Sequence, residues 1–244
     1  MRLTVLGSSS SGNCYLIHND NECLVLDAGI PFKDVVRTLN YKTKHIMGLL
    51  VTHEHKDHAK YIADYINAGI PVYTSRGTAG MISDSFCFEH VKDLEQFEIG
   101  NFTVSAFSTV HDAKEPLGFL IQHEEMGSLL FATDTAYIEY TFEDVNHFLI
   151  ECNYSQEIID KNCIDGKIPT VLRGRIMRSH MELKNCIKFL NASDAKRSRN
   201  IILCHLSDAN SDEKMFCREV ENKTGKTPVI TESGLEINLN IDPF

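Results

Sequence analysis

The sequence lacks long hydrophobic runs, linkers and repeats, and each absence narrows the class of protein. No apolar stretch of the 244 residues approaches the roughly 18 residues that cross a membrane. The opening segment, residues 1–7, has too short an apolar run for a signal peptide and instead predicts a first strand. No tract rich in proline, glycine or serine divides the chain. The sequence therefore predicts one soluble domain over residues 1–244, long enough to bury a substantial core.

The cysteines include no C-x-x-C pair, the spacing typical of small metal and redox sites. The eight are scattered along the chain: Cys14, Cys23, Cys87, Cys152, Cys163, Cys186, Cys204 and Cys217. Without an export signal, this distribution predicts reduced thiols rather than a disulfide framework. Four of them stand in apolar, strand-like segments and are expected to be buried: Cys14, Cys23, Cys152 and Cys204. We therefore expect a cytoplasmic protein without membrane association.

The chain also lacks the positive charge of proteins that clamp a long duplex. Its 34 acidic residues exceed its 24 basic residues, which gives a net charge of −10. Phosphate neutralisation supplies much of the affinity in duplex-clamping proteins, so extensive non-specific binding is disfavoured. Two local basic stretches remain, at Arg173, Arg175 and Arg178 and at residues 196–199. Each is either a local phosphate grip or a solvated face.

Strand-like and helix-like segments alternate along the chain. Strands are predicted over residues 3–6, 14–18, 23–26, 48–51, 71–73, 102–107, 118–122, 129–132, 148–151, 200–204, 228–230 and 235–239. Helices are predicted over residues 32–39, 57–67, 78–82, 182–190 and 212–223. Such interleaving predicts a layered α/β architecture.

A six-residue segment, His53-Glu54-His55-Lys56-Asp57-His58, holds four side chains able to bind a metal ion. It follows Thr52 and a predicted strand. The first two histidines alternate and can point the same way, and the turn that follows brings Asp57 and His58 back toward them. Imidazole and carboxylate ligands together suit zinc, manganese or iron. The sequence therefore predicts a metal site here.

This H-x-H-x-D-H segment resembles the second motif of the metallo-β-lactamase superfamily. Three further residues follow predicted strands in the order of that family's pattern: His111, Asp134 and His205. The resemblance implies an αββα sandwich of two mixed sheets flanked by helices. It also implies two divalent transition metals, zinc or manganese. By the resemblance, His53, His55 and His111 hold the first metal, Asp57, His58 and His205 hold the second, and Asp134 bridges them.

His180 is a candidate for a catalytic role outside the metal ligands. It stands 25 residues before His205, at the start of a predicted helix. In tRNase Z-like phosphodiesterases, a histidine in a similar place is credited with protonating the leaving oxygen. That role requires a pKa near neutrality and a position within reach of the oxygen. The alternative is a surface histidine near a helix start.

The opening Gly7-Ser8-Ser9-Ser10-Ser11-Gly12-Asn13-Cys14 is similar to that of the YycJ-like (WalJ) branch, as is Leu26-Asp27-Ala28-Gly29. Candidate substrate-binding residues are Ser10, Ser11 and Asn13 in the first segment and Ser207 beside His205. The Ser/Gly loop could donate hydrogen bonds to phosphate oxygens, or it could be a simple turn. Asp27 is expected to hold a ligand or loop from behind the site, with a plain turn residue as the alternative.

Together these features predict a two-metal phosphodiesterase of the YycJ type, most simply a nuclease. Asp57 and His180 are its predicted catalytic residues, and Asp57 together with Asp134 is expected to orient the attacking hydroxide. The first rival is hydrolysis of a cyclic nucleotide or other small phosphodiester, favoured by the net charge and by the lack of a long inserted arm. The second rival is a lactone or thioester hydrolase. Relatives are often dimers, so a homodimer is a further expectation.

Overall fold

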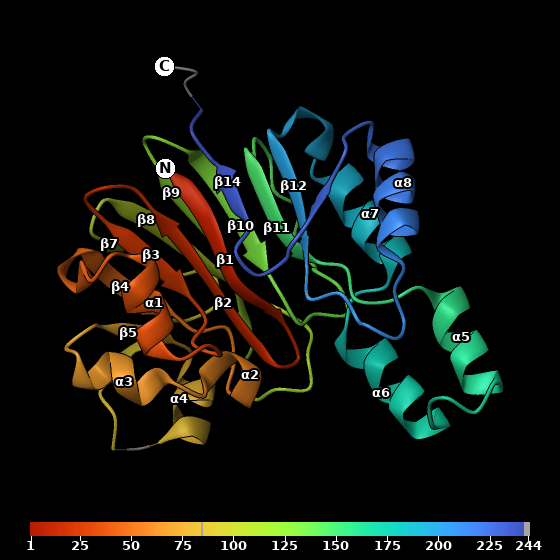
Figure 1. Cartoon of the computed structure of the whole chain (residues 1–244), viewed down its shortest axis with the longest axis horizontal. Coiled ribbons are helices and arrows are strands. Elements are labelled where there is room, and N and C mark those ends of the chain that lie inside the picture. The colour runs from red at the N-terminus through yellow and green to blue at the C-terminus, as the bar shows by residue number, and fades with distance from the viewer. Residues whose placement is uncertain (84, 242–244) are drawn as a thin grey trace. The chain divides into compact units, whose positions relative to one another are not determined.

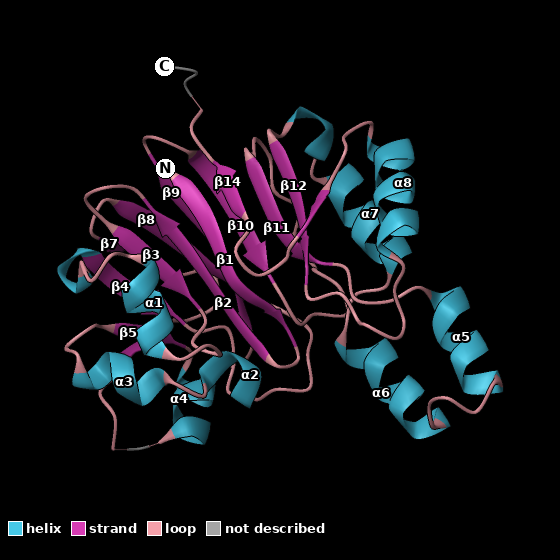
Figure 2. Ribbon diagram, in the orientation of Figure 1, coloured by secondary structure: helices cyan, strands magenta, loops and turns pink. Residues whose placement is uncertain are grey.

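The computed structural model of the chain describes residues 1–83 and 85–241 (Figure 1). The chain falls into two compact units. Unit 1 comprises Met1–Ser108, Ala113–Gly127 and the closing segment from Thr231, and unit 2 comprises Thr109–Asp112 and Ser128–Ile230. The strands belong to two mixed sheets, and helices accompany them (Figure 2). Among the described residues, no helix is long and apolar enough to cross a membrane. The single domain expected over residues 1–244 stays a prediction.

Unit 1 contains a sheet with the strand order β14-β1-β2-β3-β4-β5-β6. Its strands are β1 (Arg2–Ser9), β2 (Gly12–His18), β3 (Cys23–Leu26), β4 (Ile46–Leu50), β5 (Val72–Thr74), β6 (Glu89–His90) and β14 (Glu236–Asn238). The pairs β14–β1, β1–β2 and β2–β3 are antiparallel, and the strands from β3 to β6 are parallel. Every residue of β3 is buried, as expected for a strand covered on both faces.

Five short helices and three further strands complete unit 1. The helices are α1 (Phe32–Thr38), η1 (Thr43–His45), α2 (Lys56–Ala59), α3 (Ile62–Asn67) and α4 (Arg76–Ile82). The strands β7 (Gln96–Ile99), β8 (Phe102–Ser108) and β9 (Leu117–His123) pair in antiparallel fashion. A hydrophobic core joins the buried sides of β2 to β5 with Val35 of α1 and Tyr65 of α3. This core fixes the loop after β4, which carries the H-x-H-x-D-H segment.

The helix predicted over residues 57–67 is divided in the structure into α2 and α3. At the break, the backbone N–H of Tyr61 donates to the carbonyl of Ala28, 2.9 Å away, instead of to a carbonyl of its own helix. A helix that loses a backbone bond to a distant partner is interrupted at that residue. The break follows from tertiary contact, which the local pattern does not encode.

Unit 2 is built on parallel strands in the order β13-β12-β11-β10. They are β10 (Gly127–Ala132), β11 (His147–Glu151), β12 (Asn200–Cys204) and β13 (Val229–Ile230). The helices are α5 (Gln156–Ile164), α6 (Thr170–Ser179), α7 (Leu183–Ala192), η2 (Ala195–Arg197) and α8 (Glu213–Thr224). Because parallel strands end at the same edge of a sheet, residues that follow β10, β11 and β12 gather there.

Helices α5 and α6 were not expected from the sequence. Their apolar residues form no continuous buried stripe: in α5 only Ile159 and Asn162 are buried, and in α6 only Ser179. Without such a stripe, the sequence shows no helical period that would predict these helices.

The prediction of buried cysteines is confirmed, because Cys14, Cys23, Cys152 and Cys204 are all buried.

Candidate metal-binding and catalytic residues

In unit 1, the H-x-H-x-D-H segment lies on the loop after β4 and on α2. The ring centroids of His53 and His55 are 4.7 Å apart, and those of His53 and His58 are 4.2 Å apart. The carboxylate of Asp57 lies 3.5 Å from Nε2 of His58. His53 and His58 are buried, whereas His55 and Asp57 are partly exposed. The four side chains thus face a common space, as their spacing predicts.

Asp27, at the end of β3, holds two of these histidines in a defined orientation. Its carboxylate accepts hydrogen bonds from the backbone N–H of Thr52 (2.9 Å), the hydroxyl of Thr52 (3.0 Å) and Nδ1 of His58 (2.8 Å). Because the Thr52 hydroxyl donates its one proton to Asp27, it accepts a hydrogen bond from Nδ1 of His53 at 2.9 Å. Both histidines therefore carry their proton on Nδ1, which places the lone pair, the group that binds a metal, on Nε2.

The turn after Asp27 packs tightly on α2. The N–H of Ala28 donates to the carbonyl of His58 at 2.6 Å. A Cβ atom at Gly29 would lie 1.8 Å from the carbonyl oxygen of Asp57, so only glycine permits this approach. The amide nitrogen of Asn13, which is buried, lies 3.0 Å from Nε2 of His58. The Leu26–Gly29 segment thus positions α2 and its ligands.

In unit 2, four side chains with possible ligand atoms within 4.8 Å of one another form a second group: Asp134, Glu151, His180 and His205. Asp134 follows β10, Glu151 ends β11 and His205 follows β12, so the parallel strands bring them together. Nδ1 of His205 lies 3.1 Å from Asp134 and 3.0 Å from Glu151. Nε2 of His111 lies 3.6 Å from the carboxylate of Asp134.

Three of the site residues adopt left-handed backbone conformations. Asp27, Asp134 and His205 have φ angles of 60°, 47° and 53°; Asp27 and His205 directly follow a strand, and Asp134 lies two residues past the end of β10. This region is uncommon for residues other than glycine and costs of order 1–3 kcal/mol. The surrounding hydrogen bonds hold the strain, and the sharp turn aims each side chain across the end of its sheet.

Glu151 organises the group in unit 2, and the sequence did not identify it. This fully buried carboxylate accepts hydrogen bonds from Nδ1 of His180 (2.7 Å) and Nδ1 of His205 (3.0 Å) on one oxygen. Its other oxygen accepts the backbone N–H groups of Thr135 (2.8 Å) and Met181 (3.0 Å). Burial raises the pKa of Glu151, but the two histidines more than offset that effect and lower it. A signal existed: Glu151 closes an apolar strand at the same sheet edge as Asp134 and His205.

The pKa of His180 lies above the near-neutral value expected from the sequence, because its environment favours the protonated form. Burial lowers the pKa of His180, but the carboxylates of Glu151, Asp134 and Asp112 raise it further, to about 9. Because Nδ1 is bonded to Glu151, Nε2 is the nitrogen that remains for a substrate. The ring centroid of His180 lies 5.1 Å from that of His111 and 5.5 Å from that of His205. His180 is the C-terminal cap of α6, and two residues separate it from the start of α7 at Leu183.

His111 is oriented by a backbone group. Its Nδ1 donates to the carbonyl oxygen of Ser179 at 2.6 Å, so its Nε2 also keeps a lone pair. Burial lowers the pKa of His111, and Asp134 offsets the effect only in part, which favours the neutral imidazole that metals bind. The residues of both units fit divalent metal ions: neutral imidazole Nε2 atoms and carboxylates, each held by a second protein group.

The predicted substrate-binding residues lie in different settings. Ser10 and Ser11 are exposed in the turn between β1 and β2, whereas Asn13 is buried beside His58. The N–H of Ser207 donates to the carbonyl of Asn153 at 2.9 Å, and its hydroxyl accepts from the amide of Asn210. Ser207 therefore shapes the loop after His205. A role of these residues in substrate binding stays a prediction.

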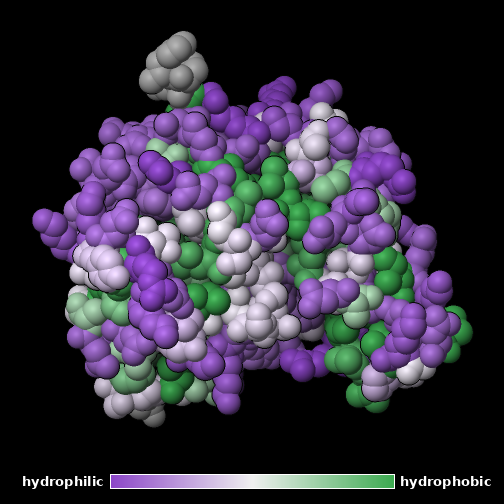
Figure 3. Space-filling model, in the orientation of Figure 1, coloured by the Kyte–Doolittle hydropathy of each residue, from purple (hydrophilic) through white to green (hydrophobic). Residues whose placement is uncertain are grey.

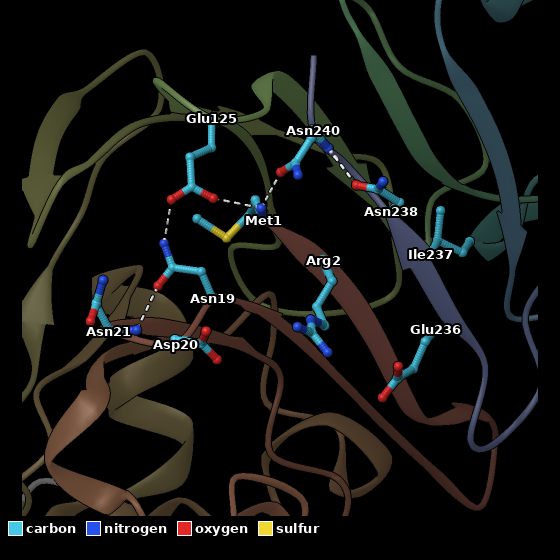
Figure 4. A pocket seen from close by; sticks show the side chains of 10 residues that line it. All are labelled: Met1, Arg2, Asn19, Asp20, Asn21, Glu125, Glu236, Ile237, Asn238 and Asn240. Atoms are coloured by element: carbon cyan, nitrogen blue, oxygen red, sulfur yellow. Dashed lines mark hydrogen bonds and ion pairs between the residues drawn. The ribbon is translucent and has the colours of Figure 1, made fainter. Parts of the chain in front are cut away.

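A further pocket of unit 1 contains none of the predicted site residues (Figure 4). It is lined by Met1, Arg2, Asn19, Asp20, Asn21, Glu125, Glu236, Ile237, Asn238 and Asn240. Glu125 accepts hydrogen bonds from the amino group of Met1 and from the amide of Asn19, and Asn240 also bonds that amino group. These bonds between neighbouring segments explain the pocket as a structural network beside β1 and β14.

Comparison with known sequences agrees with the resemblance expected from the motifs. The sequence model of the family described as Beta-lactamase superfamily domain matches residues 24–205. The chain is 28% identical over 233 residues to exodeoxyribonuclease YycJ of Bacillus anthracis. The aligned region covers 88% of this chain and 86% of that protein. The predicted similarity to the YycJ-like branch is confirmed.

Two solved structures share the fold. The metallo-β-lactamase fold protein YhfI of Bacillus subtilis matches with a TM-score of 0.74 and 15% identity, over 97% of this chain and 99% of that one. The short form of human tRNase Z matches with a TM-score of 0.68 and 15% identity, over 99% of this chain and 100% of that one. The predicted fold class, two mixed sheets flanked by helices, is confirmed.

Proposed function

The chain belongs to the β-lactamase superfamily, and we propose that it is a two-metal phosphodiesterase that hydrolyses phosphodiester bonds in DNA. The metal-dependent hydrolase class follows from the family and from the nuclease-named relative. The choice of DNA is supported by the printed name of that relative, an exodeoxyribonuclease similar over 88% of this chain. The proposed ligands are the seven predicted residues His53, His55, Asp57, His58, His111, Asp134 and His205.

The main support for the proposal is the hydrogen-bonded pair of His180 and Glu151. Breaking a phosphodiester of a sugar expels an alkoxide, which is a poor leaving group unless it receives a proton. The 2.7 Å bond to Glu151 fixes the imidazole of His180 and keeps it protonated at neutral pH, with Nε2 directed away from Glu151. His180 is therefore suited to donate a proton from Nε2 to the leaving oxygen. A thioester hydrolase has less need of such a donor, because a thiolate departs readily without a proton.

Divalent metal ions bound by these residues would supply an activated water nucleophile and offset charge on the phosphate. The protein side of the reaction follows from the described bonds. Asp27 holds His53, through Thr52, and His58 in position, and Glu151 holds His205 and His180. We further propose that Asp57 orients the attacking water. The metal identity, the cytoplasmic location and the homodimer stay predictions.

A substrate panel tests the proposal. Purified protein is loaded with zinc or manganese and assayed on linear DNA, closed circular single-stranded DNA, bis-p-nitrophenyl phosphate, cyclic nucleotides and a lactone. We expect turnover of linear DNA and of bis-p-nitrophenyl phosphate, and little turnover of the lactone. Hydrolysis of cyclic nucleotides with DNA left intact would establish the small-substrate rival instead. Turnover of the circle would show that a free strand end is not required.

A further inference from the structure

Helices α5 and α6 form a hairpin, residues 156–179, that stands away from the strands and from α7 and α8 of unit 2 (Figure 1). Three of its apolar side chains are exposed: Ile164 (85%), Val171 (85%) and Leu172 (41%). Figure 3 shows hydrophobic atoms gathered in the lower right, where Figure 1 draws this hairpin. A soluble protein that exposes large apolar side chains together at one tip usually has something to cover them.

The hairpin is also basic within an acidic chain. It contains five basic and three acidic residues, whereas the whole chain has a net charge of −10. Helix α6 carries Arg173, Arg175 and Arg178 and no acidic residue. Arg173 is engaged by Asp160 of α5 at 2.6 Å, which ties the two helices together. Arg175 and Arg178 are both exposed, and their spacing of three residues places them on one face of α6.

Three contacts fix the hairpin to the segments that carry the candidate site of unit 2. The carbonyl of Ser179, the last residue of α6, accepts Nδ1 of His111 at 2.6 Å. Arg175 donates to the carboxylate of Asp112 at 2.7 Å. The amide of Asn162 in α5 donates at 2.8 Å to the carbonyl of Ala209, in the loop that follows His205. The helix bearing the arginines therefore runs directly into His180.

From these observations, we propose that the hairpin is a binding surface for one strand of nucleic acid, which it directs toward His180. The inference rests on the proposed function and specifies how the polymer is held. Arg178 contacts a backbone phosphate, to which it is complementary in charge, while Arg175 stays paired with Asp112 and anchors the helix. The exposed side chains of Ile164, Val171 and Leu172 pack against unstacked bases, which present apolar faces in a single strand whatever their sequence. The hairpin would thus hold the substrate strand in this chain, which lacks a long inserted arm.

The test measures binding rather than turnover. A fluorescein-labelled single-stranded oligonucleotide with a hydrolysis-resistant phosphorothioate backbone is titrated with metal-loaded protein, and anisotropy is followed at several salt concentrations. One phosphate contact on a single strand contributes about 0.7 to the slope of log affinity against log salt, or about fivefold at about 0.1 M salt. Arg178→Ala should therefore lower the slope by about 0.7 and the affinity about fivefold, and Arg178→Glu should lower the affinity further.

Arg197→Ala is the matched control. Arg197 is an exposed arginine of unit 2 outside the hairpin, in η2, with 82% of its side chain exposed. Its substitution removes the same charge and should leave affinity and slope close to those of the unaltered protein. Equal losses in Arg178→Ala and Arg197→Ala, or no loss in either Arg178 variant, would overturn the proposal. So would Val171→Asp leaving oligonucleotide binding intact while abolishing self-association, because the hairpin would then bind a second copy.

The binding assay separates this inference from the proposed function. Protein that binds the oligonucleotide through Arg178 but hydrolyses neither DNA nor bis-p-nitrophenyl phosphate would contradict the enzymatic proposal and support the strand-binding surface. Normal hydrolysis of DNA by the Arg178→Glu variant would support the enzymatic proposal and contradict the proposed strand-binding surface.

Discussion

Replacing His180 with alanine tests the catalytic proposal most directly. In the structure, His180 is bonded through Nδ1 to Glu151 at 2.7 Å, and 17% of its side chain is exposed. The substitution removes the imidazole and leaves all seven proposed ligands in the sequence. We therefore expect His180→Ala to retain its metals and most of its affinity for DNA, while kcat falls.

The size of the loss follows from the role. General acid catalysis typically contributes about 10²–10⁴-fold, which corresponds to about 3–5.5 kcal/mol of transition-state stabilisation. Because the carboxylates around His180 raise its pKa to about 9, the group is almost fully protonated at neutral pH. The whole effect should therefore be visible there, and kcat on DNA should fall by about 10²–10⁴-fold.

The assay compares two leaving groups. Kinetics are measured on DNA, which expels an alkoxide, and on bis-p-nitrophenyl phosphate, which expels a phenolate that departs without a proton. The loss in kcat should shrink on the second substrate. His90→Ala, an exposed position on β6, is the control and should leave both rates unchanged within a few-fold.

Two results would refute the reasoning. Equal losses on both substrates would mean that His180 positions the phosphate rather than protonating the leaving group. No loss on either substrate would mean that its bond to Glu151 is purely structural. Metal analysis of the variant excludes the trivial explanation that the site has emptied.

Three more predictions concern the metals, a buried histidine and an acidic group. Purified protein should bind about two transition-metal ions per chain by elemental analysis, and His58→Ala or Asp134→Ala should lower that number and abolish hydrolysis; full occupancy in both variants would contradict the ligand assignment. His147→Gln, in the buried strand β11, should keep turnover within a few-fold once folded, and a collapse of activity in a folded variant would show that the site is wrongly drawn. Burial raises the pKa of Glu22, but hydrogen bonds, among them one from His123, lower it overall, so Glu22 stabilises the fold above its unfolded pKa and loses that effect as pH falls. The difference in unfolding free energy between the unaltered protein and Glu22→Gln should therefore close in acid, and a constant difference would contradict this.

The proximity of the proposed ligands of unit 1 was predictable because the pattern is local. His53, His55, Asp57 and His58 lie within six residues, so strand and turn geometry alone bring them together. The later ligands needed the family pattern as well as the strand ends. Asp134 and His205 are far apart in sequence, and only the parallel order of β10, β11 and β12, which end at one edge, makes their positions equivalent.

The parts that were missed depend on tertiary contact. Glu151 is a single buried acid at the end of an apolar strand, and no local period distinguishes it from a turn residue. The break between α2 and α3 arises from the backbone bond of Tyr61 to Ala28, more than thirty residues earlier in the chain. The α5–α6 hairpin lacks a continuous buried stripe because Ile164, Val171 and Leu172 are exposed to solvent. These exposed residues make the hairpin hard to predict from the sequence, and they also suggest a partner.

Asp27, which the sequence predicts behind the site, and Glu151, which it does not identify, matter as much as the motif. Each is a fully buried carboxylate at the end of a strand, and each accepts a proton-bearing Nδ1 from a proposed ligand: His58 in unit 1 and His205 in unit 2. An imidazole fixed through Nδ1 can offer only Nε2, in one direction, so the carboxylates set both the tautomer and the aim of the ligands. Glu151 extends the same control to His180, which couples the orientation of the proton donor to that of a ligand. The sequence motif therefore names the atoms that would bind metal, whereas two acids outside it decide where those atoms point.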